Sequence, residues 1–143
     1  AYDADGQLIS MVDRAALQFD IERDATGTWT GVVGPFGARN SVTLDSEGRL
    51  ATLTTPAGRV SQLAYNDGGL LTSFTDAAGN IHTYAYDDHG RLVRDELPSG
   101  GVITLEREET PTGNIVLHTS PEGRVTGYRH DSTAPGADTR RVL

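Results

Sequence analysis

The chain has 143 residues, a formal net charge of −8 and no cysteine. This acidic balance argues against the basic face that non-specific nucleic-acid binding needs and against attachment to an anionic membrane surface. Without cysteine there are no disulfides or thiolate metal sites, and no apolar run approaches the ~20 residues needed for insertion of a helix across a bilayer.

Glycines recur along the chain with a step of 21 residues. The first series is Gly6, Gly27, Gly48, Gly69 and Gly90, and a second series with the same step is Gly37, Gly58, Gly79 and Gly100. An Asp or Asn stands three residues before each glycine of the first series, and a large apolar residue stands two residues after it. A fixed period of this length indicates a tandem repeat.

The period predicts a repeat array over residues 1–130, of about six units, followed by an irregular C-terminal end over 131–143. The chain starts and stops inside the motif, and we therefore expect it to be a fragment of a longer protein. Because the array would be cut at both ends, its open sheet edges are expected to support self-association.

Each unit is predicted to contain two short strands, with a tight turn after each. In the unit 49–69, residues 49–54 and 59–65 are the strands, and 55–58 and 66–69 are the turns. Links this short join only antiparallel neighbours. The Asp or Asn that opens a turn can bond its own backbone, and the closing glycine supplies the positive φ of a four-residue loop with a G1 bulge.

Near the N-terminus, residues 12–23 come closest to a helical pattern. However, Leu17, Phe19 and Ile21 alternate as they would in a strand, and the phase of the repeat predicts a turn at 13–16. The sequence therefore predicts a strand here and no helix.

Alternation in the later units predicts which face of the sheet is packed. In the second strands, residues such as His82, Tyr84 and Tyr86 share one face and are mostly apolar or aromatic, which is typical of a sheet with one packed side. In the first strands, Leu50 and Leu53 are predicted to point to opposite faces, so that the sheet is partly covered on both sides.

The period slips after Gly100. The next glycine belongs at position 111, where Pro111 stands, and the glycine is found at Gly113. We therefore predict a loop over 108–113 with two extra residues. The segment 133–138 contains proline and glycine and is poor in apolar residues, so the tail is predicted to be frayed.

The segment Tyr86-Asp87-Asp88-His89-Gly90-Arg91-Leu92 carries the repeat in its full form. It resembles the YD repeat of the RHS family, which includes bacterial polymorphic toxins, shell components of insecticidal toxin complexes and animal teneurins. Segments 2–8 and 65–71 match with one or two replacements, and 44–50 lacks the tyrosine. The repeat-defining positions are Tyr2, Asp3, Gly6, Leu8, Gly27, Trp29, Asp45, Gly48, Leu50, Gly58, Tyr65, Gly69, Leu71, Gly79, Tyr84, Tyr86, Asp87, Gly90, Arg91 and Leu92.

The resemblance implies an all-β fold, in which a continuous antiparallel sheet winds spirally into a shell and this chain is one segment of it. It also implies a structural, non-catalytic role in a shell that encapsulates or displays a toxin or effector domain. The implied partners are the remaining shell and its cargo, and the implied location is secreted or cell-surface after bacterial export. The Asp-Pro pair of the family's self-cleaving region does not occur here, so autoproteolysis is not carried over.

A metal site is one reading of the polar residues around the full-form repeat. His82, Asp87, Asp88 and His89 include ordinary metal ligands. However, Asp87 is the turn-opening residue of its unit, and His89 stands at a variable turn position. We therefore favour turn chemistry and solvent exposure, and predict no metal.

An acidic cluster, Glu106, Glu108 and Glu109, stands beside the slipped loop. A carboxylate pair can do acid–base catalysis if burial shifts its pKa, but no apolar pocket is indicated here and a solvated face is favoured. The sequence has no Gly-x-Ser-x-Gly elbow and no phosphate-binding loop. We therefore predict that the chain is not an enzyme and needs no cofactor.

The aromatic residues support an alternative function, as a carbohydrate- or cell-surface-binding repeat module. Rings at strand spacing can stack on sugars, and the candidate ligand-binding residues are Tyr84, Tyr86 and His82. Cross-strand aromatic pairs also stabilise a sheet by ~0.2–1 kcal/mol each, which explains the rings without a glycan. Exposed rings at Tyr84 and Tyr86 would favour binding, and buried rings would favour the structural role.

Overall fold

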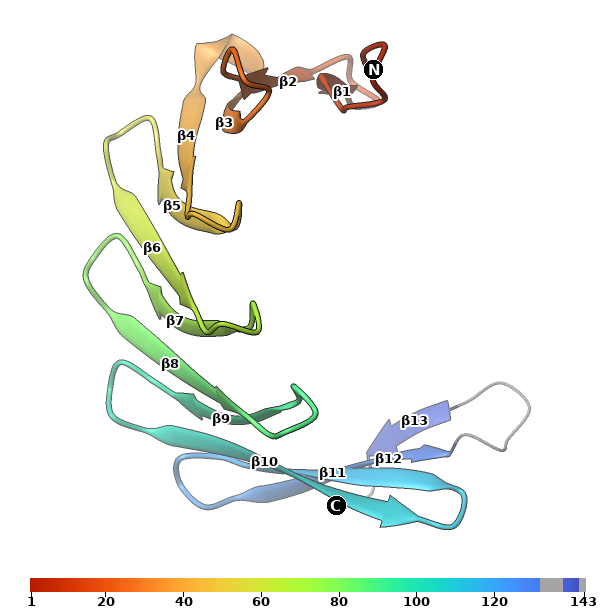
Figure 1. Ribbon diagram of the computed structural model, residues 1–143. Helices are drawn as coiled ribbons and strands as arrows, with labels where there is room; N and C mark the ends of the chain where they lie inside the picture. The colour runs from red at the N-terminus through yellow and green to blue at the C-terminus, as the bar shows by residue number, and fades with distance from the viewer. Residues whose placement is uncertain (132–137, 142–143) are drawn as a thin grey trace. The chain divides into compact units, whose positions relative to one another are not determined.

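The computed structural model describes residues 1–131 and 138–141 of the chain. The strands are β1 (Ser10–Val12), β2 (Gln18–Arg23), β3 (Trp29–Val33), β4 (Arg39–Leu44), β5 (Leu50–Thr54), β6 (Val60–Tyr65), β7 (Leu71–Thr75), β8 (Ile81–Tyr86), β9 (Leu92–Glu96), β10 (Val102–Thr110), β11 (Gly113–Thr119), β12 (Val125–Asp131) and β13 (Asp138–Arg141). One 3-10 turn, η1 (Pro35–Gly37), lies between β3 and β4. In the sheet the strands follow the order of the sequence (Figure 1). No helix in the described ranges is long and apolar enough to cross a membrane.

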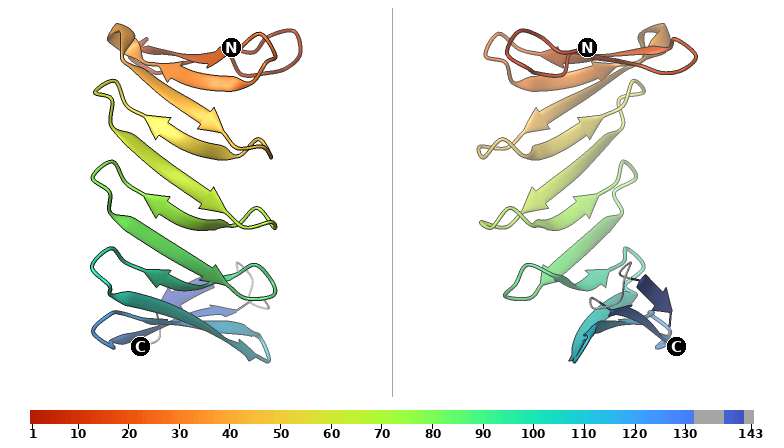
Figure 2. Two further views of the ribbon diagram at one scale, coloured as in Figure 1. Left: turned by 60° about the vertical axis from the view of Figure 1, so that its left-hand side comes forward. Right: turned by 90° about the vertical axis from the view of Figure 1, so that its right-hand side faces the viewer.

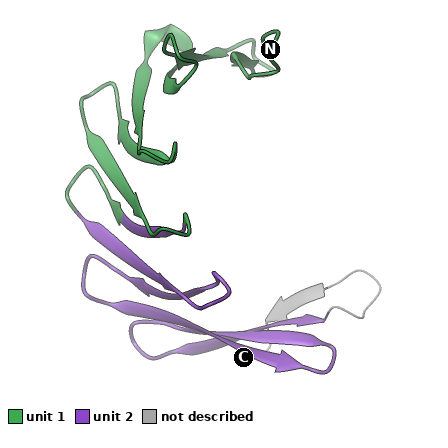
Figure 3. Ribbon diagram, viewed as in Figure 1, with its two compact units in different colours: residues 1–69, 74–79 green, residues 70–73, 80–143 purple. Residues whose placement is uncertain are grey.

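The chain divides into two compact units, which Figure 3 shows in different colours. Unit 1 contains residues 1–69 and 74–79, and within it β1 to β6 pair antiparallel in sequence order. Unit 2 contains residues 70–73 and 80–143, and within it β8 to β13 pair in the same way. Strand β7 contributes residues to both units. The predicted all-β, antiparallel fold is confirmed.

Both glycine series close the same kind of turn, and such turns are visible at both ends of the strands in Figure 2. The amide of Asp45 donates to the carbonyl of Arg49 at 2.8 Å, and the amide of Gly48 donates to the carbonyl of Asp45 at 3.0 Å. Gly48 has φ +78°, a conformation that glycine adopts without steric cost. In the second series the amide of Gly58 donates to the carbonyl of Thr55 at 2.9 Å. Because the turn-opening residue is itself paired with the residue after the glycine, the loop contains three residues where four were predicted. The predicted G1 bulge closes this loop.

The turn predicted at 13–16 forms although no glycine closes it. The Oδ1 atom of Asp13 accepts the backbone N–H groups of Ala15 and Leu17 at 2.8 and 2.9 Å. Ala16 takes the place of the glycine with φ +61°, a conformation that costs an L-residue about 1–2 kcal/mol. The phase of the repeat therefore decides this turn against the local preference of alanine.

A second kind of bulge recurs at the start of the first strand of a 21-residue repeat unit. It contradicts one prediction. In the β4–β5 pair, Val42 lies opposite Leu53 and Leu44 lies opposite Leu50, with a register shift between the two pairs. Val42 and Leu44 share a face because they are two residues apart, so Leu53 and Leu50 share that face too. The prediction that Leu50 and Leu53 point to opposite faces is wrong, because the bulge adds one residue between them and thereby brings both onto one face. Equivalent register shifts occur in the β2–β3 and β8–β9 pairs.

The slipped hairpin takes its extra residues into the strands. β10 extends to Thr110, which pairs with Gly113, so that a two-residue turn, Pro111-Thr112, closes the hairpin. The predicted loop over 108–113 is therefore wrong, since its first residues belong to the ladder. Every residue of this hairpin is described, and its register is continuous. The tight turn has replaced both the longer loop and its bulge.

The described residues of neither unit form a large core. Among the described residues, Val42, which is 6% exposed, is the only buried apolar side chain. β6 and β8 alternate strictly between exposed and half-buried residues, and Tyr84 and Tyr86 are on the half-buried side. The packed face predicted for the second strands is therefore present but only partly covered. Phe36, in η1, is 97% exposed.

The irregular end predicted over 131–143 lies mostly outside the described residues. Within it, the backbone of β13 pairs with β12. The frayed tail predicted over 133–138 lies outside the described residues except for its last position.

Candidate functional site

Side-chain contacts in unit 1 join turns that are one 21-residue period apart. The Nε atom of Arg49 donates to Oδ2 of Asp45 at 2.7 Å, and Nη1 of Arg49 donates to the carbonyl of Asn66 at 3.0 Å. The same guanidinium lies 5.0 Å from the ring centroid of Tyr65, within the range of a cation–π interaction. Arg49 thus connects the acid that opens one turn, the repeat tyrosine and the equivalent turn one period later.

The repeat tyrosines bind the backbone of the preceding strand. The hydroxyl of Tyr65 donates to the carbonyl of Leu50 at 2.9 Å, and the hydroxyl of Tyr86 donates to the carbonyl of Leu71 at 2.7 Å. Each acceptor stands 15 residues before its tyrosine. Both rings are half-buried. This arrangement gives the two tyrosines a structural role, since the polar end of each side chain is bonded within the sheet.

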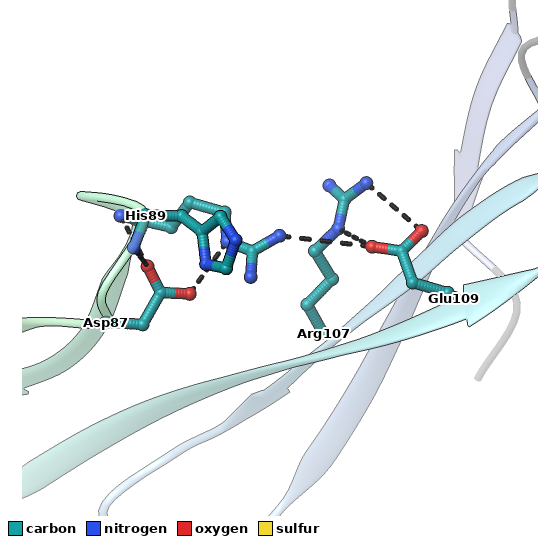
Figure 4. A network of polar contacts seen from close by, with 5 residues as sticks. Asp87, His89, Arg107 and Glu109 are labelled. Carbon is teal, nitrogen blue, oxygen red and sulfur yellow. Dashed lines mark hydrogen bonds and ion pairs between the residues drawn. The ribbon is translucent and has the colours of Figure 1, made fainter.

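In unit 2 the full-form repeat carries a network of charged side chains (Figure 4). The Nε atom of Arg91 donates to Oδ2 of Asp87 at 2.7 Å, while Nη1 of Arg91 lies 3.9 Å from Oε1 of Glu109. The Nε atom of Arg107 donates to the same oxygen of Glu109 at 2.6 Å. The backbone amides of His89 and Arg91 donate to Oδ1 of Asp87 at 2.9 and 3.0 Å. The amide of Arg91, followed by its side chain, lowers the pKa of Asp87 to about 2.

This network predicts a loss of stability in acid. The pKa of Asp87 falls from an ordinary value of 3.8 to about 2 in the folded chain, so its contribution is complete above the unfolded-state pKa and is lost as the pH falls toward 2. We expect the melting temperature to fall between about pH 4 and pH 2, and to fall less in an Asp87→Asn variant. Circular dichroism melts across this range measure the effect. Asp88→Asn, at the exposed next position, is the matched control, and equal acid profiles for D87N and the wild-type chain would contradict the prediction.

The candidate ligand-binding residues are partly brought together. The rings of His82 and Tyr84 are stacked, with centroids 6.2 Å apart and planes inclined by 14°. The Nδ1 atom of His82 lies 3.3 Å from Oδ1 of Asp95. Burial, and then the nearby charge of Asp95, raise the pKa of Tyr84. Tyr86 is on the same strand, but its hydroxyl is bonded to the backbone of Leu71.

The residues weighed as a metal site have separate partners. His82 contacts Asp95, whereas Asp87 is bonded to Arg91 and to the amides of its own turn. Within the described part of the chain, no group of three or more His, Asp or Glu side chains could hold a metal ion.

The acidic cluster is divided between the two faces of β10. Glu106 and Glu108 are two residues apart and share one face, and Glu109 lies on the other. The hydrogen bond from Arg107 lowers the pKa of Glu109 below its ordinary value. Glu109 is therefore paired with a cation and does not face the other two carboxylates.

Two cavities lie beside positions where a repeat tyrosine is replaced. The first, of about 690 Å³ in unit 2, is lined by Leu92, Leu105, Arg107 and Val116 among others. Glu106 and Glu108 also line it, so the expectation that no apolar pocket lies beside the acidic cluster is wrong. The second, of about 520 Å³ in unit 1, is lined by Arg23, Trp29, Leu44 and Leu50 among others.

Sequence reasoning missed these cavities, although the sequence contains a signal for them. Stepping by 21 residues from Tyr65 and Tyr86 places Arg107, Leu44 and Arg23 at the tyrosine position. The replacement at Leu44 is recognised from the sequence, and comparing the repeat units column by column would have added Arg23 and Arg107.

Comparison with known proteins agrees with the repeat. Residues 1–142 match the family model of the teneurin YD-shell. No curated protein matches the sequence. One chain in the crystal structure of TcdB2-TccC3-Cdc42 is similar with a TM-score of 0.61 and 17% identity, over 92% of this chain and 8% of that chain. A crystal structure of TcdB2-TccC3 is similar with a TM-score of 0.50 and 19% identity, over 92% of this chain and 7% of that chain. These similarities show the fold, and the chain spans less than a tenth of either structure's matched chain.

Proposed function

The chain belongs to the teneurin YD-shell family, and from that premise we propose that it is a non-catalytic segment of a shell wall that encapsulates or displays a toxin or effector domain. The observation that carries the proposal is where the repeat side chains direct their polar groups. Tyr65 and Tyr86 bond to backbone carbonyls of preceding strands, and Arg49 joins two equivalent turns one period apart. Residues that bond in this way hold neighbouring 21-residue repeat units together.

The proposed partners are the remaining shell and its cargo. Because the chain spans only 8% of the TcdB2-TccC3-Cdc42 chain that it matches, most of such a wall would come from other residues. The small core also supports a partner, since apolar side chains such as Phe19 and Leu53 remain 37% and 36% exposed. A shell that delivers an effector acts outside the cell that makes it, so we propose a secreted or cell-surface location after bacterial export.

One observation supports a second candidate function, recognition of a glycan or cell-surface partner. The stacked rings of His82 and Tyr84 are half-buried, so part of their surface remains accessible. Aromatic faces of this kind can stack on a sugar.

Two measurements test the proposal against this alternative. In the complete polypeptide that carries the segment, limited proteolysis should leave the effector domain uncut while the shell is intact, and cut it once the shell is opened by denaturant. The chain alone, applied to a glycan array, should bind no sugar. A protease-sensitive effector in the intact polypeptide contradicts encapsulation. A sugar that the wild-type chain binds, and that a folded Tyr84→Ala variant does not, favours recognition.

A further inference from the structure

The cavity beside Arg107 lies at a position where the repeat normally places a tyrosine ring. Tyr65, Tyr86 and Arg107 stand at successive steps of 21 residues. The cavity of about 690 Å³ is lined by Arg107 itself, and its volume lies within the ~300–1,000 Å³ range of small-ligand pockets. The smaller cavity of unit 1 is likewise lined by Arg23 and Leu44, the other replaced positions. The two cavities therefore share one origin, the loss of the ring.

The occupied positions show what such a cavity accepts. At Tyr65, the ring lies 5.0 Å from the guanidinium of Arg49, and the hydroxyl donates to the carbonyl of Leu50. At Tyr86, the hydroxyl donates to the carbonyl of Leu71. A phenol ring is thus held by a backbone acceptor at one end and, in the first case, by a cation at its face.

The Arg107 cavity retains the equivalent groups. Leu92 stands where Leu50 and Leu71 stand in their units, and Arg91 stands where Arg49 stands. Both residues line the cavity. Leu105 and Val116 lie on the same face of the sheet as Arg107, because Arg107 pairs directly with Val116 and Leu105 is two residues away on the same strand.

The side chain of Arg107 does not occupy the tyrosine's place. Its Nε atom donates to Oε1 of Glu109 at 2.6 Å, and its Nη2 atom lies 3.4 Å from the other oxygen of the same carboxylate. Figure 4 shows Arg107 bonded to Glu109. Glu109 thereby holds one guanidinium directly and lies 3.9 Å from a second, that of Arg91.

We propose that the Arg107 cavity binds the phenol side chain of a tyrosine from a polypeptide held against this face of the sheet. The ring packs on Leu92, Leu105 and Val116, its hydroxyl donates to the carbonyl of Leu92, and its negative π-face meets the guanidinium of Arg91. This electrostatic match selects an aromatic side chain over an aliphatic one. The proposal rests on the proposed function, because a shell wall is a surface against which a cargo polypeptide is held.

The probe for this site is the blocked tripeptide acetyl-Gly-Tyr-Gly-amide, titrated into the 143-residue chain with labelled Leu and Val methyl groups. We expect saturable NMR shifts at Leu92, Leu105 and Val116. The Phe tripeptide should bind about three- to tenfold more weakly, because it lacks the hydroxyl, and the Leu tripeptide should be weaker again. Free p-cresol is the comparison ligand for a site that admits only small phenols.

Two variants at one position fill or empty the cavity. Arg107→Tyr restores the repeat tyrosine and should weaken binding of the tyrosine tripeptide by at least about tenfold. Arg107→Ala leaves the cavity open and should retain binding, so a loss of binding in R107Y alone is not a general folding defect. Leu44→Tyr makes the same kind of replacement in unit 1 and should leave the shifts at Leu92, Leu105 and Val116 unchanged.

Three results would overturn the proposal. Equal binding of the Leu and Tyr tripeptides would show a site without aromatic selectivity. Binding of p-cresol without the tripeptide would exclude a polypeptide ligand, and unchanged binding in R107Y would place the ligand elsewhere. The titration contains neither a complete shell nor a cargo domain, so its failure is distinguishable from a failure of encapsulation, which the proteolysis assay measures separately.

Discussion

A Gly113→Ala variant is expected to unfold about 10 °C below the wild-type chain, which corresponds to a loss of about 3 kcal/mol of unfolding free energy. A β-carbon on Gly113 would lie 1.9 Å from the carbonyl oxygen of His130 and 3.1 Å from the Cα atom of Asp131. These neighbours are backbone atoms of β12, so no side-chain rotation can relieve the clash. The β11–β12 pair must separate locally to accept the methyl group.

Calorimetry gives the size of this effect, and amide hydrogen exchange gives its place. Exchange should accelerate in β11 and β12 of unit 2, while the amides of β4 to β6 in unit 1 keep their wild-type rates. Gly68→Ala is the matched control, because a β-carbon there would meet only the side-chain oxygen of Asn66, at 3.3 Å. That exposed substitution should change stability by no more than about 0.5 kcal/mol. A G113A melting temperature close to that of G68A would contradict the argument.

Tyr86 is expected to give the second large effect. Truncation in Tyr86→Ala should cost about 2–3 kcal/mol, because it removes a half-buried ring and the hydrogen bond to the carbonyl of Leu71. Tyr86→Phe keeps the ring and loses only the hydrogen bond, so it should cost about 1 kcal/mol. Urea unfolding curves of the three proteins measure both steps.

The comparison between these two variants separates packing from hydrogen bonding. Tyr128→Phe, at an exposed ring in unit 2, serves as the control and should lie within about 0.5 kcal/mol of the wild-type chain. If Y86F were as stable as the wild-type chain, the hydroxyl would have no role in holding the strands together. If Y86A were equally mild, the repeat tyrosine would not be a structural residue.

The turns and strands of this chain could be predicted from the sequence because they depend on local chemistry. An Asp that bonds its own turn and a glycine with positive φ recur at fixed spacing, and Asp45 and Gly48 behave as that pattern requires. The phase was informative even at Ala16, where the residue type alone argues against the observed conformation.

The bulge at the start of the first strand of a repeat unit, unlike the G1 bulge of the turns, could not be predicted, because it depends on how two strands pair. Nothing in the residues 50–53 indicates an extra residue, and an ideal alternation places Leu50 and Leu53 on opposite faces. The pairings with Leu44 and Val42 show instead that they share one face. For the same reason the reach of Tyr65 to the carbonyl of Leu50 was not foreseen, since this bond depends on the position of the neighbouring strand.

The candidate site was only partly predictable. The proximity of His82 and Tyr84 follows from strand spacing, and the structure brings their rings together. The partner of His82 is Asp95, on the next strand, which spacing along the sequence cannot identify. The sequence shows that Arg107 replaces the repeat tyrosine, because it stands 21 residues after Tyr86. Its pairing with Glu109 could not be predicted, because it requires the extended β10.

The β10–β11 hairpin indicates how a repeat unit of this chain can change length. In the β2–β3, β4–β5 and β8–β9 hairpins of the first glycine series, the three-residue loop and the one-residue bulge are both odd insertions, and together they leave each side chain on its own side of the sheet. The β10–β11 hairpin has neither, and its two-residue turn and continuous register reach the same result with even numbers. In evolution or in engineering, a hairpin of this array should therefore tolerate residues gained in twos, whereas a single added codon demands a second, compensating irregularity. A repeat unit that lengthens by two residues therefore leaves the side chains of every later repeat unit on the same faces of the sheet.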